Sequence, residues 1–322
     1  MALPPAGQCC GVTSALGVEL TGLQRMRFDD GLPVRAASAV APLGDGWLVA
    51  QDDATSAAWV RPSGTVVVRV LPPVEGHDVF SEAEGTKHLK PDLEAACELL
   101  LDGEPSVLLL GSGSTPRRMR ACLVQLEDDG PRVTVGDLTP LYAEVARALG
   151  IAPDELNLEG ACRLGDTLRW FARGNLAAGV PSASVDLDAA ALLAVVLGDA
   201  EAREVSLGGV RHYDLGEVEG VGLAVTDAVA LPDDRVLVSA SAEDTPNAVD
   251  DGPVVATALA LLDGDAVVAV GALPEPDGEV HKVEGLALVE PRPDGARLLA
   301  VVDADDPLAP SVQLDLQVRW QA

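Results

Sequence analysis

One short pattern recurs along the chain and limits what it can fold into. A polar residue, acidic in four of five copies, lies near the start of an apolar segment, and a second apolar run follows after a short turn. The first segments are AASAVAPLG from Ala36, DLEAACELL from Asp92, NLEGACRLG from Asn157, VTDAVALPD from Val225 and KVEGLALVE from Lys282. Their equivalent positions are Ser38, Glu94, Glu159, Asp227 and Glu284, at separations of 56, 65, 68 and 57 residues. Five hairpins at this spacing are typical of β-propeller blades with loop insertions.

The missing strand of the fifth unit supplies a second constraint. Each of the first four units contains two further strand-like segments, whereas the fifth contains only SVQLDLQVRW before the chain ends. The alternating segment VELTGLQRMRFDD (18–30) precedes the first hairpin and can complete the last blade. Closing the ring this way leaves no blade incomplete and no sheet edge open between blades. We therefore expect an all-β, five-bladed β-propeller closed by an N-terminal strand. Six blades is the alternative, if the long third unit hides another blade.

One segment departs from the strand pattern. Leu141, Val145 and Leu149 follow helical spacing and Gly150 ends the run, which predicts one short helical insertion near 140–150. The stretch ASVDLDAAALLAVVLG from Ala183 is expected to be a strand of the third unit. The whole of 1–322 is expected to form a single propeller domain, with 1–14 as a flexible leader.

Charge and composition argue against several classes of partner. The formal net charge is −29 and the only short basic stretch is PRRMR at 116–120, so neither nucleic acid nor an anionic membrane surface is an expected partner. No apolar run reaches the roughly 18 residues that span a membrane, and the N-terminus lacks the regions of a signal peptide. Five cysteines without a CxxC pair favour reduced thiols. We expect a cytoplasmic protein.

A propeller would gather many charged residues on one face. The start of a first strand and the end of a second lie at the same edge of a hairpin, so both border the mouth of the central channel. All three lysines of the chain fall on this face. The residues expected to bind a ligand there are Lys87, Lys90, Arg173, Asn175, Lys282 and Asp303, and the candidate catalytic residues are Glu94, Glu159, Glu284 and His281. Other polar residues expected on the face include Gln51, Asp52, Asp53, Ser112, Ser114, Asp92, Asn157, Ser241, Glu243 and His88.

Four carboxylates near one axis need compensation. They must bind a cation, pair with Lys or Arg, or take up protons. Because Ca²⁺ accepts six to eight oxygen ligands, Glu94, Glu159, Asp227 and Glu284 are candidate ligands of a divalent cation, Ca²⁺ first among them. No organic cofactor is expected, since the sequence contains no GxxxxGK[ST] loop and no GxGxxG followed by a helix. The alternative is that these acids hold neighbouring blades together through hydrogen bonds to the backbone.

The stretch LNLEGACRLGDTLRWFARGN (156–175) resembles repeats of bacterial propellers of unknown function, which are related to the phytase-like and esterase-like propellers and carry EG after an apolar residue. KPDLEAA (90–96) and HKVEGLALV (281–289) fit the same pattern. The chain departs from this pattern in three units. In the second unit Ala95 rather than glycine follows Glu94, and in the first unit Ser38 replaces the acid. In the fourth unit Asp227 replaces the glutamate, unless Glu219–Gly220 is the true equivalent. The resemblance implies the fold more firmly than an activity.

Two classes of function fit these observations. The first is a small-molecule-binding propeller that acts as a metal-assisted hydrolase on an ester, lactone or phosphoester, with Lys90, Lys282 and Arg173 holding an anionic substrate at the channel mouth. The alternative is a non-catalytic propeller that binds a ligand or a protein and uses its channel acids structurally. The placement of the lysines favours the first.

Overall fold

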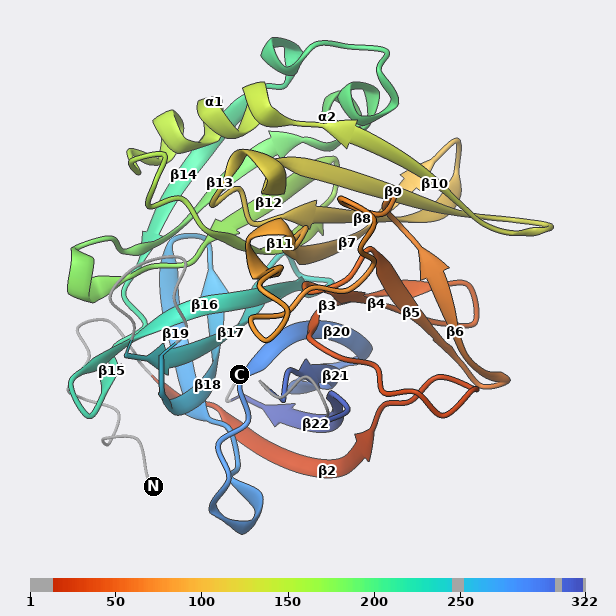
Figure 1. Cartoon of the computed structure of the whole chain (residues 1–322). Coiled ribbons are helices and arrows are strands. Elements are labelled where there is room, and N and C mark those ends of the chain that lie inside the picture. The colour runs from red at the N-terminus through yellow and green to blue at the C-terminus, as the bar shows by residue number, and fades with distance from the viewer. Residues whose placement is uncertain (1–13, 245–251, 305–308, 321–322) are drawn as a thin grey trace.

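The computed structural model describes residues 14–244, 252–304 and 309–320, and it is a five-bladed β-propeller (Figure 1). Each of the first three blades is a four-stranded antiparallel sheet. Their strands are β3 (Ala37–Leu43), β4 (Gly46–Gln51), β5 (Ser56–Arg61) and β6 (Gly64–Arg69) in blade 1; β7 (Leu93–Leu101), β8 (Glu104–Gly111), β9 (Arg120–Glu127) and β10 (Gly130–Asp137) in blade 2; and β11 (Leu158–Leu164), β12 (Thr167–Ala172), β13 (Ser182–Asp188) and β14 (Leu207–Tyr213) in blade 3.

The last two blades receive extra strands from elsewhere in the chain. Blade 4 consists of β16 (Val221–Ala230), β17 (Val236–Glu243), β18 (Val254–Asp263) and β19 (Ala266–Ala272), flanked by the short β15 (Glu217–Val218) and β1 (Ser14–Ala15). Blade 5 consists of β20 (Val283–Arg292), β21 (Gly295–Val302), β22 (Val312–Arg319) and β2 (Gly17–Arg25). Consecutive first strands pack against one another from β3 through β7, β11, β16 and β20 back to β3. This closed ring confirms five blades and leaves no place for a sixth.

The N-terminal strand closes the ring as the alternation predicts. β2 pairs antiparallel with β22, with Gly17 opposite Arg319 and Arg25 opposite Val312. Just before it, β1 pairs parallel with β19, so one short segment joins the outer edges of blades 4 and 5. The flexible leader expected over 1–14 lies outside the described residues, except for Ser14, which belongs to β1.

Two α-helices lie on the outer side of blades 2 and 3 (Figure 1). α1 (Thr139–Leu149) confirms the predicted insertion, and Gly150 ends it in the left-handed conformation at φ 70°. α2 (Ala189–Leu197) replaces the second half of the stretch that was expected to be one strand, so that expectation was wrong. The reason is local: β13 ends at Asp188, whose side chain accepts a hydrogen bond from the Ala191 amide at 2.8 Å and caps an alanine- and leucine-rich run.

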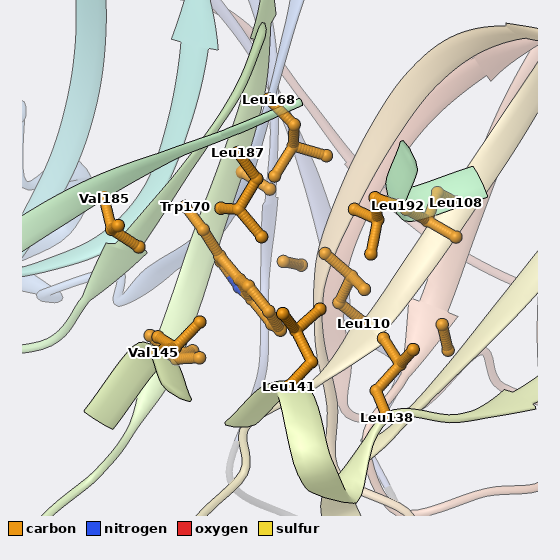
Figure 2. Packing of buried hydrophobic residues seen from close by; sticks show 14 of the residues in the cluster. Leu108, Leu110, Leu138, Leu141, Val145, Leu168, Trp170, Val185, Leu187 and Leu192 are labelled. Atoms are coloured by element: carbon orange, nitrogen blue, oxygen red, sulfur yellow. The ribbon is translucent and has the colours of Figure 1, made fainter. Parts of the chain in front are cut away.

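The helices complete the largest part of the core. Leu141 and Val145 of α1 pack beside Trp170 of blade 3, next to leucines of blades 2 and 3 (Figure 2). Tyr142 meets Trp170 edge to face at 4.9 Å between ring centroids, and its hydroxyl donates to the Gly111 carbonyl. These contacts hold α1 against the end of β8 and the middle of β12. No helix of the described chain has the length and apolarity that a membrane crossing requires.

Candidate functional site

A β-bulge in every first strand builds the candidate site. In each blade the pairing of the first two strands skips a residue at the equivalent place, and these residues are Ser38, Glu94, Glu159, Thr226 and Glu284. Blade 5 has a second skip further along, at Val289. A bulged residue leaves the ladder and its side chain is re-aimed, which is why bulges are common beside functional sites. The polar residue of the sequence repeat is therefore the bulged residue of each blade, with one exception.

The exception is blade 4, where the repeat alignment was wrong by one residue. The bulged position is Thr226, not Asp227, and Glu219–Gly220 lies in the turn between β15 and β16. The Thr226 hydroxyl donates to the Val283 carbonyl at 2.6 Å, just as the Ser38 hydroxyl donates to the Leu93 carbonyl at 2.5 Å. In these two blades the bulged residue links its blade to the next one.

Asp227, the residue after Thr226, is fully buried and also links blade 4 to its neighbours. Its Oδ2 accepts a hydrogen bond from the Leu286 amide of blade 5 at 2.6 Å, and the amides of Ala228 and Ala161 also donate to the carboxylate. Burial raises its pKa well above the ordinary value. The structure thus places Asp227 among backbone groups of three blades, which is the contact that the structural alternative predicts for it.

A first cluster of charges lies between blades 1 and 2. Lys90, just after the 3₁₀ turn η1 (Lys87–Leu89), forms an ion pair with Asp52 and lies 2.7 Å from Asp92 Oδ1. Arg118 Nη1 lies 2.8 Å from Asp92 Oδ2. Burial alone would raise the pKa of Asp92, but Lys90 and Arg118 outweigh it and bring the pKa to about 2. Asp92 itself has a left-handed backbone at φ 56°, a strained conformation of the kind that gathers at functional sites.

Glu94 is the carboxyl group of this cluster that lacks a partner. Among the described residues it makes no hydrogen bond and no ion pair, although Lys90 stands nearby. Burial, with Asp92 and Asp52 next to it, raises its pKa well above the ordinary value. One oxygen from each of Asp52, Asp92 and Glu94 lies within 4.8 Å of the other two. Three such oxygens in one place are the kind of ligand that a hard divalent cation takes.

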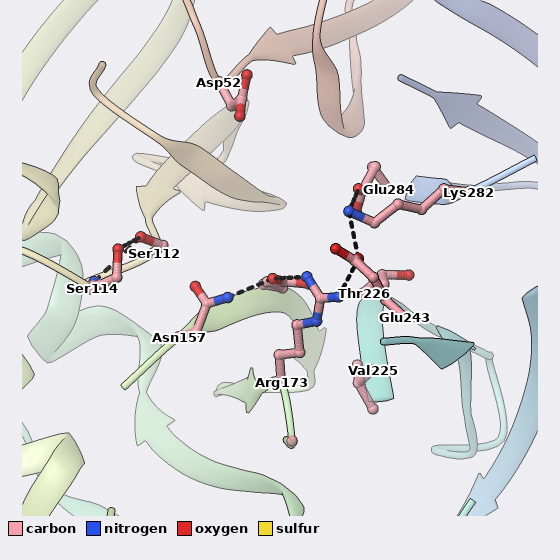
Figure 3. Close-up of polar contacts among 12 residues, drawn as sticks. Asp52, Ser112, Ser114, Asn157, Arg173, Val225, Thr226, Glu243, Lys282 and Glu284 are labelled. Carbon is pink, nitrogen blue, oxygen red and sulfur yellow. Dashed lines mark hydrogen bonds and ion pairs between the residues drawn. The ribbon is translucent and has the colours of Figure 1, made fainter. Parts of the chain in front are cut away.

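A second cluster joins blades 3, 4 and 5 through a chain of ion pairs (Figure 3). Arg173 Nη1 lies 3.0 Å from Glu159 Oε1, and Arg173 Nη2 lies 2.5 Å from Glu243 Oε2. Lys282 Nζ continues the chain, 3.0 Å from the same Glu243 oxygen and 2.7 Å from Glu284 Oε1. The structure therefore brings together five residues that the sequence assigned to one face, and Glu243 is the acid that the two cations share.

The comparison with protein families bears on the chain as a whole. Residues 86–307 match the model of a family of unknown function, DUF6910. The chain belongs to this family. The match covers blades 2 to 4 and the whole first hairpin of blade 5, and it includes nearly all of the site. The resemblance to phytase-like and esterase-like propellers remains a prediction.

Comparisons with other proteins add little to the family assignment. One solved structure, of a protein from Bacteroides fragilis NCTC 9343 named as a candidate exported protein, matches with a TM-score of 0.39 and 9% identity over 95% of this chain and 96% of that one. A protein of unknown function from Dyadobacter fermentans DSM 18053 matches with a TM-score of 0.37 and 10% identity over 95% of this chain and 100% of that one. At these scores neither carries an argument about the site. No curated protein matches this DUF6910 chain significantly.

The remaining four predicted residues of this DUF6910 chain lie in or beside turns and strand ends. Lys87 lies 3.2 Å from the exposed Glu82, and Asn175 caps the turn η3 (Leu176–Ala178) by accepting a hydrogen bond from the Ala178 amide. Asp303 follows β21 and is half-buried. His281 is buried, and its Nε2 has no hydrogen-bond partner within the part of the chain that the structure describes.

Sequence reasoning left four residues out of the candidate site. Asp52, Asp92 and Glu243 were assigned to the face but not to the site, although their place at strand ends could have singled them out. Arg118 comes from the 3₁₀ turn η2 (Pro116–Arg118), and no repeat or spacing pointed to it.

Proposed function

We propose that this DUF6910 chain binds a divalent cation, Ca²⁺ before others, at Asp52, Asp92 and Glu94, and uses it to hydrolyse an ester, lactone or phosphoester at the channel mouth. The observation that carries the proposal is the approach of the three carboxylate oxygens to within 4.8 Å of one another. Glu94 is the one ligand retained from the set expected from sequence. Glu159 and Glu284 are held instead by Arg173 and Lys282, and Asp227 by backbone amides.

Charge balance supports a cation at this place. The two clusters together hold six carboxyl groups against four cations, so they carry two negative charges in excess when every acid is ionised. The six are Asp52, Asp92, Glu94, Glu159, Glu243 and Glu284, and the four are Lys90, Arg118, Arg173 and Lys282. Protons on Glu94 and Glu159, whose pKa values are raised, offset this excess, and a divalent cation would offset it equally well.

The cation would also supply the positive charge that attracts an anionic substrate. Lys90, Arg173 and Lys282 each contact two carboxylates already, so they have little attraction left for an anion. A bound cation would polarise a carbonyl or phosphoryl oxygen and lower the pKa of a water ligand, the two contributions that metal-assisted hydrolysis needs. The positive charge for an anionic substrate would therefore come from the cation rather than from the lysines.

Calorimetry and thermal unfolding with Ca²⁺, Mn²⁺ and Zn²⁺ test the cation site. A cation at a hundred times its Kd should stabilise the wild type by about 2.7 kcal/mol, and NaCl at matched ionic strength should not. Glu94→Gln should lose this gain, whereas Glu98→Gln, the same change at an exposed position of β7, should keep it. Hydrolysis of ester, lactone and phosphoester probes, with and without the cation, then tests the activity. Equal stabilisation of wild type and Glu94→Gln would refute the site.

A second candidate function is a non-catalytic binding propeller. The chain of ion pairs from Glu159 to Glu284 crosses three blades, and this favours a structural use of the acids. In that case Glu94→Gln and Glu284→Gln would lower the free energy of unfolding, and neither a cation nor a hydrolysis probe would distinguish them from wild type.

A further inference from the structure

The carboxyl group of Glu159 is held by one oxygen only. Oε1 accepts hydrogen bonds from Asn157 Nδ2 at 2.7 Å and from Arg173 Nη1 at 3.0 Å. Oε2 is buried and has no hydrogen-bond partner among the described residues, and Glu159 as a whole is only 5% exposed. A buried oxygen without a partner is costly, so such a group requires an explanation.

The surroundings of Glu159 come from every neighbouring blade. Arg173 lies on its own blade, Glu94 faces it from blade 2, Lys282 and Glu284 face it from blade 5, and Glu243 of blade 4 shares Arg173 with it. The described contacts of Glu159 are with Asn157 and Arg173, and none of the three proposed cation ligands is among them. Asn157 and Arg173 both donate to Oε1. The neighbouring acids Glu94 and Glu284 disfavour a negative charge on the Glu159 carboxylate.

We propose that Glu159 is the proton donor of this site, with its proton on Oε2 and directed at an oxygen of the bound substrate. A protonated carboxyl group offers one O–H donor and an acceptor oxygen, and this matches the arrangement of Oε1 and Oε2. The pKa of Glu159, raised to about 7 mainly by burial, agrees with a proton that is held and released near neutral pH. The inference rests on the proposed hydrolase function and assigns a role within it.

The step it would perform is general-acid hydrolysis. A water oxygen forms a bond to the carbonyl carbon of the substrate, and the bond from that carbon to the leaving oxygen breaks. The proton of Glu159 Oε2 passes to the leaving oxygen, which departs as an alcohol. The proton lost by the attacking water restores Glu159 through the solvent. An ester therefore gives one acid and one alcohol, and a lactone gives a single hydroxy acid.

The same surroundings narrow the substrate class. The leaving oxygen must accept a hydrogen bond next to Glu94 and Glu284, where a further negative charge is unfavourable. A carboxylic ester or a lactone places an uncharged oxygen there, whereas a phosphoester would bring a charged group close to two acids. The expected substrates are therefore carboxylic esters of alcohols, or lactones.

The test compares two leaving groups in Glu159→Gln. The glutamine oxygen can still accept from Asn157 and Arg173, but its amide has no proton to transfer. Ethyl acetate needs protonation of its leaving oxygen, and 4-nitrophenyl acetate needs it little. We expect kcat/KM to fall by about a hundredfold or more on the ethyl ester and by much less on the nitrophenyl ester. Glu98→Gln is the matched control and should resemble wild type on both.

Infrared difference spectra locate the proton without any substrate. Wild type minus Glu159→Gln should show a carboxylic acid band at about pH 6 that disappears at about pH 8.5, on either side of the pKa of about 7. Asn157→Ala removes a donor to Oε1, so the band should persist to higher pH. A missing band, or equal losses on the two esters in an active enzyme, overturns the role of Glu159 and leaves the hydrolase proposal standing. Wild type that turns over neither these esters nor any lactone or phosphoester probe, with or without the cation, overturns both proposals.

Discussion

Glu159 and Glu243 flank the same arginine, yet their pKa values move in opposite directions. Glu243 contacts both Arg173 and Lys282, and its Oε1 accepts from the Gly252 amide, so its pKa falls to about 2 in spite of burial. Glu159 contacts one cation and has Glu284 nearby, so burial prevails and its pKa rises to about 7. Two buried glutamates on one guanidinium therefore titrate in separate pH ranges.

These shifts predict opposite effects of pH on stability. The ordinary pKa of a glutamate is 4.5. Because the pKa of Glu159 is raised, Glu159 stabilises the fold at pH values below 4.5, and this stabilisation is lost as pH rises towards 7. The lowered pKa of Glu243 stabilises the fold above 4.5, and this is lost as pH falls towards 2. Each contribution is about 3 kcal/mol. Urea unfolding at a series of pH values measures this. In Glu159→Gln the free energy of unfolding should no longer fall as pH rises above 4.5. In Glu243→Gln it should no longer fall as pH drops below 4.5. Identical pH profiles in wild type and both variants would contradict the assignment.

The sequence predicts which of these residues share a face but not how they pair. Glu159, Arg173, Lys282 and Glu284 stand at strand ends, and hairpin geometry alone places them together. Thr226 could not be distinguished from Asp227, because both are polar and a bulge shifts the register by one residue without changing the pattern. The partners of Arg173 depend on the reach of side chains from three blades, which no spacing in the sequence encodes.

The glycine that follows the bulged acid in blades 3 and 5 allows neighbouring first strands to approach closely. A Cβ at Gly160 would lie 2.9 Å from the Ala228 nitrogen and from Asp227 Cα, and a Cβ at Gly285 would lie 2.9 Å from Ala39 Cα. These contacts are with backbone atoms of the next blade, which cannot rotate away, although the Cβ at Gly285 would also lie 2.7 Å from the Val301 side chain of its own blade. In the EG pair of the repeat, the glutamate faces the channel and the glycine lets two blades pack closely. Blade 2 has Ala95 at the position of the glycine, so there is room for a Cβ between blade 2 and the next blade.

Alanine at these glycines should separate the blades. Gly160→Ala and Gly285→Ala force backbone shifts in β16 and β3, and we expect each to lower the free energy of unfolding by about 1–3 kcal/mol. Gly208→Ala in β14 is the matched control, because no atom lies within 4 Å of its added Cβ. The measurement is urea unfolding of the three variants. Equal effects at all three positions would show that the close approach is not what constrains the repeat.

At the level of elements, strands and α1 were predictable, and α2 was not. The repeat fixed the first two strands of each blade, and Leu141, Val145 and Leu149 marked α1. The run from Ala183 to Gly198 begins with strand alternation and continues into a uniformly apolar stretch, in which helix and buried strand are not distinguished by periodicity. Only Asp188 and Gly198 mark the ends of α2 as cap residues, and an acid or a glycine fits a turn between strands equally well.

At the scale of the whole molecule, β2 makes the ring continuous. It covers the edge of β22, and Leu16 just before it is buried in the core shared by blades 4 and 5, with Val18 and Leu20 packed against that core. Each fully buried side chain of this kind contributes about 1.5–3 kcal/mol, against a net stability of only about 5–15 kcal/mol for a typical domain. Leu16 is buried whereas Val18 and Leu20 are only partly buried, so this segment contributes a sizeable fraction of the stability of the whole fold.

Removal of the closing strand should consequently abolish cooperative folding. A chain that starts at residue 27 lacks β1 and β2 and exposes the edge of β22, so we expect a broad thermal transition and association in size-exclusion chromatography. A chain that starts at residue 14 keeps both strands and should melt as the full chain does. A peptide of residues 14–26 added to the shortened chain should restore the sharp transition by pairing with β22, because strand addition needs only a free edge and matching side chains. A shortened chain that melts like wild type without the peptide would mean that blade 5 is stable with three strands and that ring closure is not what holds the propeller together.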